Sequence, residues 1–487
     1  MLAKGFFGRE HFEPKHGYRL APFRFGRLDS RRYVATNDVG EWVVLADEEL
    51  RAFAGHRLPV SAPVYARLAA RHFLFDDSSE CALDLLALKY RTRAERLARL
   101  TGLHIFVTTL RCEHSCHYCQ VSRKVEDTSG AFDMSVEHAD RALDVSLASP
   151  SPSIKIEFQG GEPLLRFDLI RHVVERAEAL NATIGKDLQF VIATNLARLT
   201  DEVLDFCRAH NIFLSTSLDG PEAIHNAHRP SRSGNSYQMT IDGIHRARAA
   251  LGVDRVSALM TTTPASLDQV EAIVDEYVRQ GFHGIFLRSL SPYGFAARSS
   301  LMRRNDTERW LDFYQRGLAH VIRLNRAGHA LREEYTTILL QKMLLPGGAG
   351  YVDLQSPSGI GIGALVYNYD GAVYASDEGR MLAEMDDRSF RIGHLDQDDF
   401  GALIRARPLL DVLEDTLLES VPMCADCPFL PHCGADPVFH RATQGDVVGH
   451  KAFSGFCSKQ MGVLRHVIAL LEDDVDSAEI LHAWCRS

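Results

Sequence analysis

Short apolar runs alternate with amphipathic stretches from about residue 100 to residue 300. The apolar runs predict six strands, at residues 103–109, 153–159, 188–195, 212–219, 256–262 and 284–290. The stretches between them, such as 167–180 and 199–210, have the apolar spacing of helices that cover a sheet. Six strand and helix units in succession predict an α/β fold with a parallel sheet, either a barrel or an open doubly wound sheet.

The flanking regions follow other patterns. Residues 31–46 predict a β-hairpin, and residues 47–58 and 61–74 predict helices with Asp47 and Ser61 as N-caps. Toward the C-terminus, ALVYNYDGAVYAS predicts a hairpin that turns at Asp370 and Gly371, and a helix is expected to end the chain. We therefore expect an N-terminal α+β module at 1–95, a strand and helix domain at 96–325 and a C-terminal domain at 326–487.

Composition and charge narrow the function. The 487 residues carry a formal net charge of -10 at pH 7, which argues against broad nucleic-acid binding, because such binding depends on lysine and arginine. The first residues lack the apolar core of a signal peptide, and no apolar run is long enough to span a bilayer. We expect a cytoplasmic protein without a membrane or nucleic-acid partner.

The ten cysteines fall into groups. In a reducing cytoplasm, cysteines at short fixed spacings are more often metal ligands than disulfides. Cys81, Cys207 and Cys485 stand alone and are expected to pack as small apolar side chains. The two groups of candidate ligands are Cys112, Cys116 and Cys119, and then Cys424, Cys427, Cys433 and Cys457.

The first group offers only three thiolates. A structural zinc site takes four protein ligands, and His114 and His117 alternate with the cysteines in a way that makes it hard to aim them at one ion. We expect both histidines to face solvent. A four-iron cluster on three cysteines would leave one iron open to an external ligand.

Polar side chains follow the predicted strands where each strand ends. The cysteine loop follows the first strand, GGEP the second, Asn195 the third, and Asp219 with Gly220 the fourth. Such residues meet at the carboxyl end of a parallel sheet, where active sites of these folds lie.

Together, Cys-x3-Cys-x2-Cys with Tyr118 before the last cysteine and the later QGGEPLL resemble the signature of the radical S-adenosylmethionine (SAM) superfamily. The resemblance implies a partial (β/α)6 TIM-like barrel. It also implies a [4Fe-4S] cluster on Cys112, Cys116 and Cys119, with the amine and carboxylate of SAM on the open iron. One-electron reduction in that family cleaves SAM and yields a 5'-deoxyadenosyl radical, which abstracts hydrogen from the substrate.

The resemblance also assigns residues to SAM. Gly160, Gly161 and Glu162 would meet the methionyl amine, and Tyr118 would lie near the adenine. STSLDGPEAIHNAHR resembles an element of the peptide-modifying branch, in which Ser217 and Arg229 help to hold the carboxylate and ribose, while Asn195 would reach the ribose. Asp219 is a candidate base, although its tight turn equally favours a backbone-capping role.

The second cysteine group resembles the SPASM domain of peptide and sulfatase maturases, which holds auxiliary clusters. No cysteine lies between Cys207 and Cys424, and Pro437 occupies a position where the family pattern has cysteine. We therefore expect one auxiliary [4Fe-4S] cluster on Cys424, Cys427, Cys433 and Cys457, with four-thiolate zinc as the alternative. Asp377 and Glu378, at the end of the hairpin, are expected to be surface carboxylates.

A narrower resemblance, across nearly the whole chain, is to the radical SAM maturases of the His-Xaa-Ser peptide system. It implies a ribosomally made precursor peptide as substrate, an external electron donor such as flavodoxin or ferredoxin, and a paired radical SAM maturase. The N-terminal module would read the leader peptide or simply cap the barrel. A crosslink or another oxidation is favoured as the product. Two alternatives stay open: an anaerobic sulfatase-type formylglycine maturase, and a peptide-binding partner of another maturase.

Overall fold

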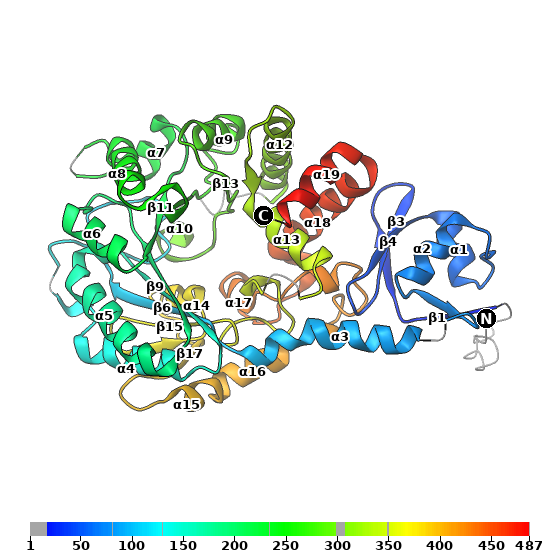
Figure 1. The fold of residues 1–487 in the computed structure, drawn as a ribbon, viewed down its shortest axis with the longest axis horizontal. Helices are drawn as coiled ribbons and strands as arrows, with labels where there is room; N and C mark the ends of the chain where they lie inside the picture. The colour runs from blue at the N-terminus through cyan, green and yellow to red at the C-terminus, as the bar shows by residue number, and fades with distance from the viewer. Residues whose placement is uncertain are drawn as a thin grey trace.

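The computed structural model describes residues 17–79, 81–128, 130–232, 234–298, 307–347 and 350–486. Its largest sheet, here called the central sheet, has eight strands and lies on the left in Figure 1. The strands follow the order β12-β11-β10-β9-β6-β15-β16-β17. The pairs from β12 to β15 are parallel, and the last two pairs are antiparallel. The strands are β6 (Leu103–Thr109), β9 (Ser153–Gly160), β10 (Asp187–Ala193), β11 (Phe213–Ser217), β12 (Val256–Leu259), β15 (Ala364–Tyr367), β16 (Ala372–Tyr374) and β17 (Arg391–His394).

Helices cover one face of this sheet, as the apolar pattern predicts. In β9, Ile154, Ile156 and Phe158 are buried in the main core, whereas the alternating Glu157 and Gln159 are only half-buried. The other face carries these polar side chains on β9 and a separate buried apolar cluster on β6, β15 and β16. The helices between the strands are α4 (Val136–Ala148), α5 (Phe167–Ile184), α6 (Asp201–Ala209), α7 (Glu222–His228), α8 (Ser236–Leu251) and α9 (Val270–Arg279). The predicted α/β fold with a parallel sheet is confirmed.

The sixth predicted strand is shorter than expected. Only β13 (Gly284–Ile285) is extended, and it pairs with β14 (Arg332–Glu333) outside the central sheet. The backbone leaves the strand because Glu333 Oε1 accepts the amide of Leu287 at 3.0 Å. Ladder pairing in the central sheet thus ends at β12, although β13 lies beside it and the Thr262 amide donates to the Arg288 carbonyl at 2.9 Å.

The C-terminal hairpin extends the central sheet on its other side, because β15 pairs in parallel with β6. The predicted hairpin is present, but its loop is longer than two residues. The amide of Asn368 donates to the carbonyl of Ala372 at 2.9 Å, so three residues form the loop. Gly371 has a φ of +84°, which glycine adopts without strain.

The N-terminal module has its own small core. Strands β2 (Arg24–Arg27), β3 (Arg32–Thr36) and β4 (Trp42–Ala46) form an antiparallel sheet, and β1 (Tyr18–Leu20) pairs with β5 (Leu74–Asp76). The two predicted helices, α1 (Asp47–Ala54) and α2 (Pro63–Ala70), are present. Their N-caps are Ala46 and Ala62 rather than Asp47 and Ser61. Residues 1–16 of the predicted module lie outside the described residues, and α3 (Ala82–Arg99) leads from the module to β6.

Helices dominate the remaining C-terminal region. They are α10 (Gly294–Arg298), α12 (Thr307–Arg326), α13 (Glu334–Leu344), α14 (Asp377–Ala383), α15 (Phe400–Ile404), α16 (Arg407–Asp415), α17 (Pro437–Gln444), α18 (Gly455–Asp473) and α19 (Val475–Trp484). The helix expected at the end of the chain corresponds to α18. No helix in the described part of the chain combines the length and apolar character needed to cross a bilayer.

Candidate functional site

The first cysteine group lies in the loop that follows β6. The short strand β7 (Arg111–Cys112) pairs with β8 (Lys124–Val125), and the other two cysteines lie between them. Backbone hydrogen bonds hold this loop against the segment after α7: the Ser115 amide donates to Pro230 at 2.8 Å, and the His117 amide donates to His228 at 3.1 Å. The loop is thereby fixed at the carboxyl edge of the parallel sheet.

Gly160 and Gly161 let the end of β9 lie directly against this loop. A Cβ on Gly160 would lie 1.9 Å from the carbonyl oxygen of Thr109, and one on Gly161 would lie 2.3 Å from that of Arg111. The amides of Gly161 and Glu162 instead donate to these two carbonyls, both at 2.8 Å. Any side chain at either glycine would displace the cysteine loop.

Glu162 is fully buried at this edge and accepts three hydrogen bonds. Its donors are the Thr194 hydroxyl at 2.7 Å and the amides of Asn195 at 2.9 Å and Leu164 at 3.0 Å. Burial, with the nearby carboxylate of Glu113, raises the pKa of Glu162 to about 7. No cation neutralises this carboxylate within the described residues, so an ammonium group bound against it would be stabilised.

Asn195 joins the third strand to the cysteine loop. Its Nδ2 lies 2.7 Å from Glu113 Oε1 and 2.8 Å from His114 Nδ1. His114 is therefore buried, which contradicts the expectation that it faces solvent, whereas His117 is exposed. The loop carries His114 inward because its ring is held between Glu113 and Asn195.

The three loop cysteines do not converge as ligands of one zinc ion. On a tetrahedral zinc, two sulfur atoms would lie about 3.8 Å apart. The ligand atoms of Cys112, Glu113 and His114 lie within 4.8 Å of one another. Among the described residues, no group of three or more ligand atoms this close together contains two cysteines. Burial raises the pKa of the Cys116 thiol to about 11, so a bound metal would be needed to keep it deprotonated at neutral pH.

Asp219, Tyr118 and Arg229 form a buried network beside the loop. The Tyr118 hydroxyl donates to Asp219 at 2.6 Å, and Arg229 donates to both carboxylate oxygens at 2.9 and 3.3 Å. The guanidinium also lies 5.3 Å from the centre of the Tyr118 ring. Burial alone would raise the pKa of Asp219, but Arg229 and the neighbouring histidines hold it well below its usual range.

The remaining polar residues of the fourth strand support this network. Ser217 is the last residue of β11 and is half-buried, two positions before Asp219. The amide of Asp219 donates to His225 Nδ1 at 3.4 Å, a buried ring whose pKa burial lowers to about 3. The structure thus brings together the predicted SAM residues at the edge that holds the cysteine loop, and it adds Glu113, Thr194 and His225, which the sequence analysis did not single out.

The second cysteine group lines one cavity of about 260 Å³ in the C-terminal region. Its four thiols share this cavity with apolar side chains such as Phe429 and Met461, and with the cations of Lys451 and Arg465. No three metal-ligand atoms among these cysteines lie within 4.8 Å of one another, although a zinc ion would hold its sulfur ligands about 3.8 Å apart. The lining therefore fits a larger group held by four thiolates, such as an iron-sulfur cluster, better than zinc.

A set of charged side chains lies close to the second cysteine group, and we refer to it as the charged cluster: Arg288, Asp353, Glu378, Asp436 and Lys459. Arg288 lies 4.0 Å from Glu378, and the Lys459 ammonium donates to the Ser289 hydroxyl at 3.0 Å. Burial and the neighbouring carboxylates raise the pKa values of Glu378, Asp353 and Asp436 above their usual range.

The neighbouring Asp377 is also enclosed, since it pairs with the buried Arg380 at 2.7 Å. Asp377 and Glu378 are thus largely covered, with side-chain exposures of 14% and 27%, and the expectation of surface carboxylates is wrong. The short helix α14 packs against α17. The placement of Asp436 three residues after Cys433, and of Lys459 two residues after Cys457, is the sequence signal that could have pointed to this cluster.

Comparison with known proteins gives a consistent picture. Residues 106–277 match the family model of the radical SAM superfamily. The chain is 28% identical over 192 residues to an uncharacterized protein of Methanocaldococcus jannaschii, a match that covers 39% of this chain and 62% of that protein. It is 22% identical over 308 residues to the serine-type anaerobic sulfatase-maturating enzyme of Klebsiella aerogenes. That match covers 61% of this chain and 69% of that enzyme. The chain thus spans less than two thirds of the archaeal relative.

Solved structures show the same fold. The structure of anSMEcpe with bound AdoMet and Cp18Cys peptide superimposes with a TM-score of 0.62 at 14% identity, covering 79% of this chain and 98% of that chain. The structure of SuiB from Streptococcus suis bound to the precursor peptide SuiA superimposes with a TM-score of 0.51 at 11% identity, covering 90% and 99%. At these identities the likeness concerns the fold alone.

Proposed function

We propose that this chain, which contains a radical SAM domain, modifies a ribosomally made peptide by abstracting a hydrogen atom from one of its residues. Cys112, Cys116 and Cys119 would hold a [4Fe-4S] cluster, and SAM would take the open iron. When bound, the cluster and SAM supply one-electron cleavage of the sulfonium and hydrogen-atom abstraction.

The observation that carries this proposal is the joint placement of Glu162, Asn195 and the cysteine loop at one sheet edge. Glu162 offers a buried carboxylate to the methionyl ammonium, and Gly160 and Gly161 bring that carboxylate against the loop. Asn195 bridges both elements and would reach the ribose. Glu162 has no counter-charge among the described residues, so a bound ammonium would complete this arrangement.

Asp219 suits a positioning role better than that of a base. It already accepts hydrogen bonds from Tyr118 and Arg229, and its pKa is held low, so it has little tendency to take a proton. Through these contacts it would orient the Tyr118 ring toward the adenine and hold the Arg229 guanidinium for the carboxylate and ribose, with Ser217 at the end of the same strand.

The charged cluster is the candidate place for proton removal from the substrate. Oxidation of a C–H position releases one hydrogen atom, one further electron and one proton. Glu378, whose pKa is raised by burial and by the carboxylates of Asp353 and Asp377, is the group of this cluster proposed to accept that proton. The second cysteine group, which would hold one auxiliary [4Fe-4S] cluster, lies close to this cluster and would accept the electron. This placement favours a crosslink or another oxidation as the product.

A peptide substrate is supported by two proteins of the same fold that are solved with bound peptides. The resemblance to the His-Xaa-Ser maturases then favours a precursor peptide of that system, with the N-terminal module as the reader of its leader. A cytoplasmic flavodoxin or ferredoxin would deliver the electron, and a paired radical SAM maturase would share the substrate.

A sulfatase-type formylglycine maturase is the second candidate, because the aligned relatives include serine-type anaerobic sulfatase-maturating enzymes. The chain differs from the pattern implied for that class, since residues 208–423 contain no cysteine for a second auxiliary cluster. This difference makes the peptide maturase the better proposal.

Anaerobic turnover separates the two candidates. The reconstituted protein would be incubated with SAM, a reductant and either a His-Xaa-Ser precursor peptide or a sulfatase peptide containing the target serine. Formation of 5'-deoxyadenosine with a mass loss of about two hydrogen atoms in the precursor alone supports the proposal. Oxidation of the sulfatase peptide alone would overturn it in favour of the second candidate.

A further inference from the structure

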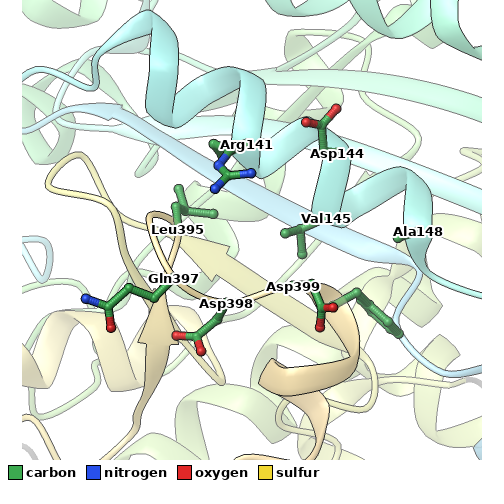
Figure 2. A pocket seen from close by; sticks show the side chains of 9 residues that line it. Arg141, Asp144, Val145, Ala148, Leu395, Gln397, Asp398 and Asp399 are labelled. Carbon is green, nitrogen blue, oxygen red and sulfur yellow. The ribbon is translucent and has the colours of Figure 1, made fainter.

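Two histidines and an aspartate meet on the far side of the sheet from the N-terminal module, where α4 contacts the loop after β17. His138 lies in the first turn of α4, His394 ends β17, and Asp396 follows two residues later. Their ligand atoms all lie within 4.8 Å of one another. Figure 2 shows the neighbouring part of this contact, where Arg141 of α4 and Leu395 line one cavity.

The separations in this group differ from those of ordinary histidine and carboxylate pairs in the same structure. His172 with Asp140, His210 with Glu178 and His320 with Asp275 lie at 2.7, 2.8 and 2.6 Å, and all three are hydrogen-bonded. By contrast, Asp396 Oδ1 lies 3.3 Å from His138 Nε2, and Asp396 Oδ2 lies 3.4 Å from His394 Nδ1, so the carboxylate turns one oxygen to each ring.

These wider separations fit two ligands of one metal ion. With bonds of about 2.0 to 2.1 Å to nitrogen and oxygen, a tetrahedral zinc ion holds its ligand atoms about 3.3 to 3.4 Å apart. A charge-assisted hydrogen bond would instead draw a nitrogen and an oxygen to about 2.7 to 2.9 Å. Both Asp396 contacts therefore have the length of a metal-bridged pair.

The hydrogen bonds around His394 favour the form of the ring that binds a metal. Its Nε2 lies 3.1 Å from the carbonyl oxygen of Asp370 and can donate only, which leaves Nδ1 as the unprotonated nitrogen. The Asp396 amide lies 3.3 Å from Nδ1, a long hydrogen bond that an ion bound to Nδ1 would replace. In this tautomer the ring offers no hydrogen to the Asp396 carboxylate, whose Oδ2 lies 3.4 Å from Nδ1, so that contact is not a hydrogen bond.

Gly371 makes room for the two rings. A Cβ on this residue would lie 2.6 Å from His138 Nε2 and 2.8 Å from His394 Cε1. The hairpin loop between β15 and β16 thus supplies both the carbonyl that orients His394 and the space in which His138 approaches it. His138 Nδ1 is buried without a partner in the described part of the chain, so Nε2 is the nitrogen directed at the group.

We propose that His138, His394 and Asp396 bind a zinc ion that clamps α4 to the C-terminal hairpin. Two imidazoles and one carboxylate are a ligand set that zinc accepts, with water in the fourth position. The Asp396 side chain is 62% exposed, so the ion and its water reach the site from solvent. The clamp joins the first helix of the radical SAM domain to the strands that extend its sheet, and it is separate from both cysteine groups.

Metal analysis of the full chain tests this site without relying on activity. The anaerobically reconstituted protein, with both cysteine groups loaded, would be equilibrated with zinc and desalted, and zinc and iron would be counted together. The variants are His394→Ala and Asp396→Asn. His172→Ala is the matched control, because His172 forms an ordinary hydrogen bond to Asp140, which lies on α4 together with His138.

Wild type and His172→Ala should hold about one zinc per chain more than the two site variants, at equal iron. Their thermal midpoints should also rise on zinc addition, whereas those of the site variants should not. Asp396→Asn keeps the test decisive if His394→Ala folds poorly, since Asp396 is exposed. Equal zinc in wild type and Asp396→Asn, or loss of the zinc from His172→Ala, would overturn the proposal.

Discussion

Asp219 shows how a single residue carries the organisation of the cofactor site. The sequence places it in a tight turn after the fourth strand, which gives equal weight to a catalytic and a structural role. The buried ion pair with Arg229 and the hydrogen bond from Tyr118 decide for the structural one, since the two partners that would touch SAM are both held by this carboxylate. Spacing along the chain could predict that these residues meet, but not that one of them positions the other two.

Asp219→Asn is expected to destabilise the protein because it leaves Arg229 as a buried cation without its counter-charge. Loss of one partner of a buried pair costs about 3 to 5 kcal/mol. Urea unfolding of the metal-free chain measures this, with Asp254→Asn as the control on an exposed carboxylate. A loss smaller than about 1 kcal/mol for Asp219→Asn would contradict the assigned role.

At the scale of elements, the pairing of β15 with β6 is the main feature that the sequence does not predict. The apolar pattern of residues 364–376 predicts a hairpin, because that pattern is local. Which strand the hairpin joins depends on contacts across more than 250 residues, and local periodicity carries no information about them. For the same reason the sequence predicts a seven-residue strand at 284–290, where the side chain of Glu333 ends the strand early.

The sequence pattern does not predict helix α3, for a different reason. Its leucines and Tyr90 lie on several faces, with Leu83, Leu85 and Leu88 all substantially exposed, so no single apolar stripe marks it as a helix. By contrast, the strand ends of the radical SAM domain were predicted well, because the glycine pair and the cysteine spacing are dictated by local chemistry.

The pairing of β6 with β15 makes the protein sensitive to acid through His104. This ring is fully buried on β6, with Nδ1 2.8 Å from the Tyr367 hydroxyl of β15, and burial lowers the pKa of His104 to about 3. Below pH 6.5, His104 becomes protonated in the unfolded chain but stays neutral in the folded chain. Stability is therefore lost as the pH falls from 6.5 toward 3, by about 1.4 kcal/mol per pH unit.

His104→Gln should remove this contribution. Between pH 6.5 and 5, the variant is expected to lose about 2 kcal/mol less than wild type in free energy of unfolding. His283→Gln, at an exposed histidine, should behave like wild type. If His104→Gln showed the same acid sensitivity as wild type, the neutral buried state of His104 would be refuted.

At the scale of the whole molecule, the protein combines two cysteine groups with the charged cluster close to the second of them. In the proposed reaction, hydrogen abstraction would take place near the first group, and the proton and the electron would leave toward the second. The proposed oxidation therefore depends on the C-terminal region as much as on the radical SAM domain.

Glu378→Gln should uncouple the two halves of the reaction. SAM cleavage depends on the first cysteine group and should persist, while the yield of modified peptide per 5'-deoxyadenosine should fall by about tenfold or more, because general base catalysis contributes at least that factor. In wild type the same ratio should rise with pH, because burial raises the pKa of Glu378 and the carboxylate becomes a base only after it loses its proton. If this ratio changes with neither the substitution nor the pH, Glu378 is not the base that accepts the proton.

The most direct test of the account is iron and sulfide analysis with electron paramagnetic resonance on the reconstituted protein, beside a Cys112, Cys116 and Cys119 triple alanine variant. Two four-iron clusters predict about eight irons in wild type and about four in the variant, with a spectrum that shifts on SAM addition in wild type alone. About four irons with one zinc in wild type would indicate that the second cysteine group is a structural zinc site. A spectrum that does not respond to SAM would contradict the central claim.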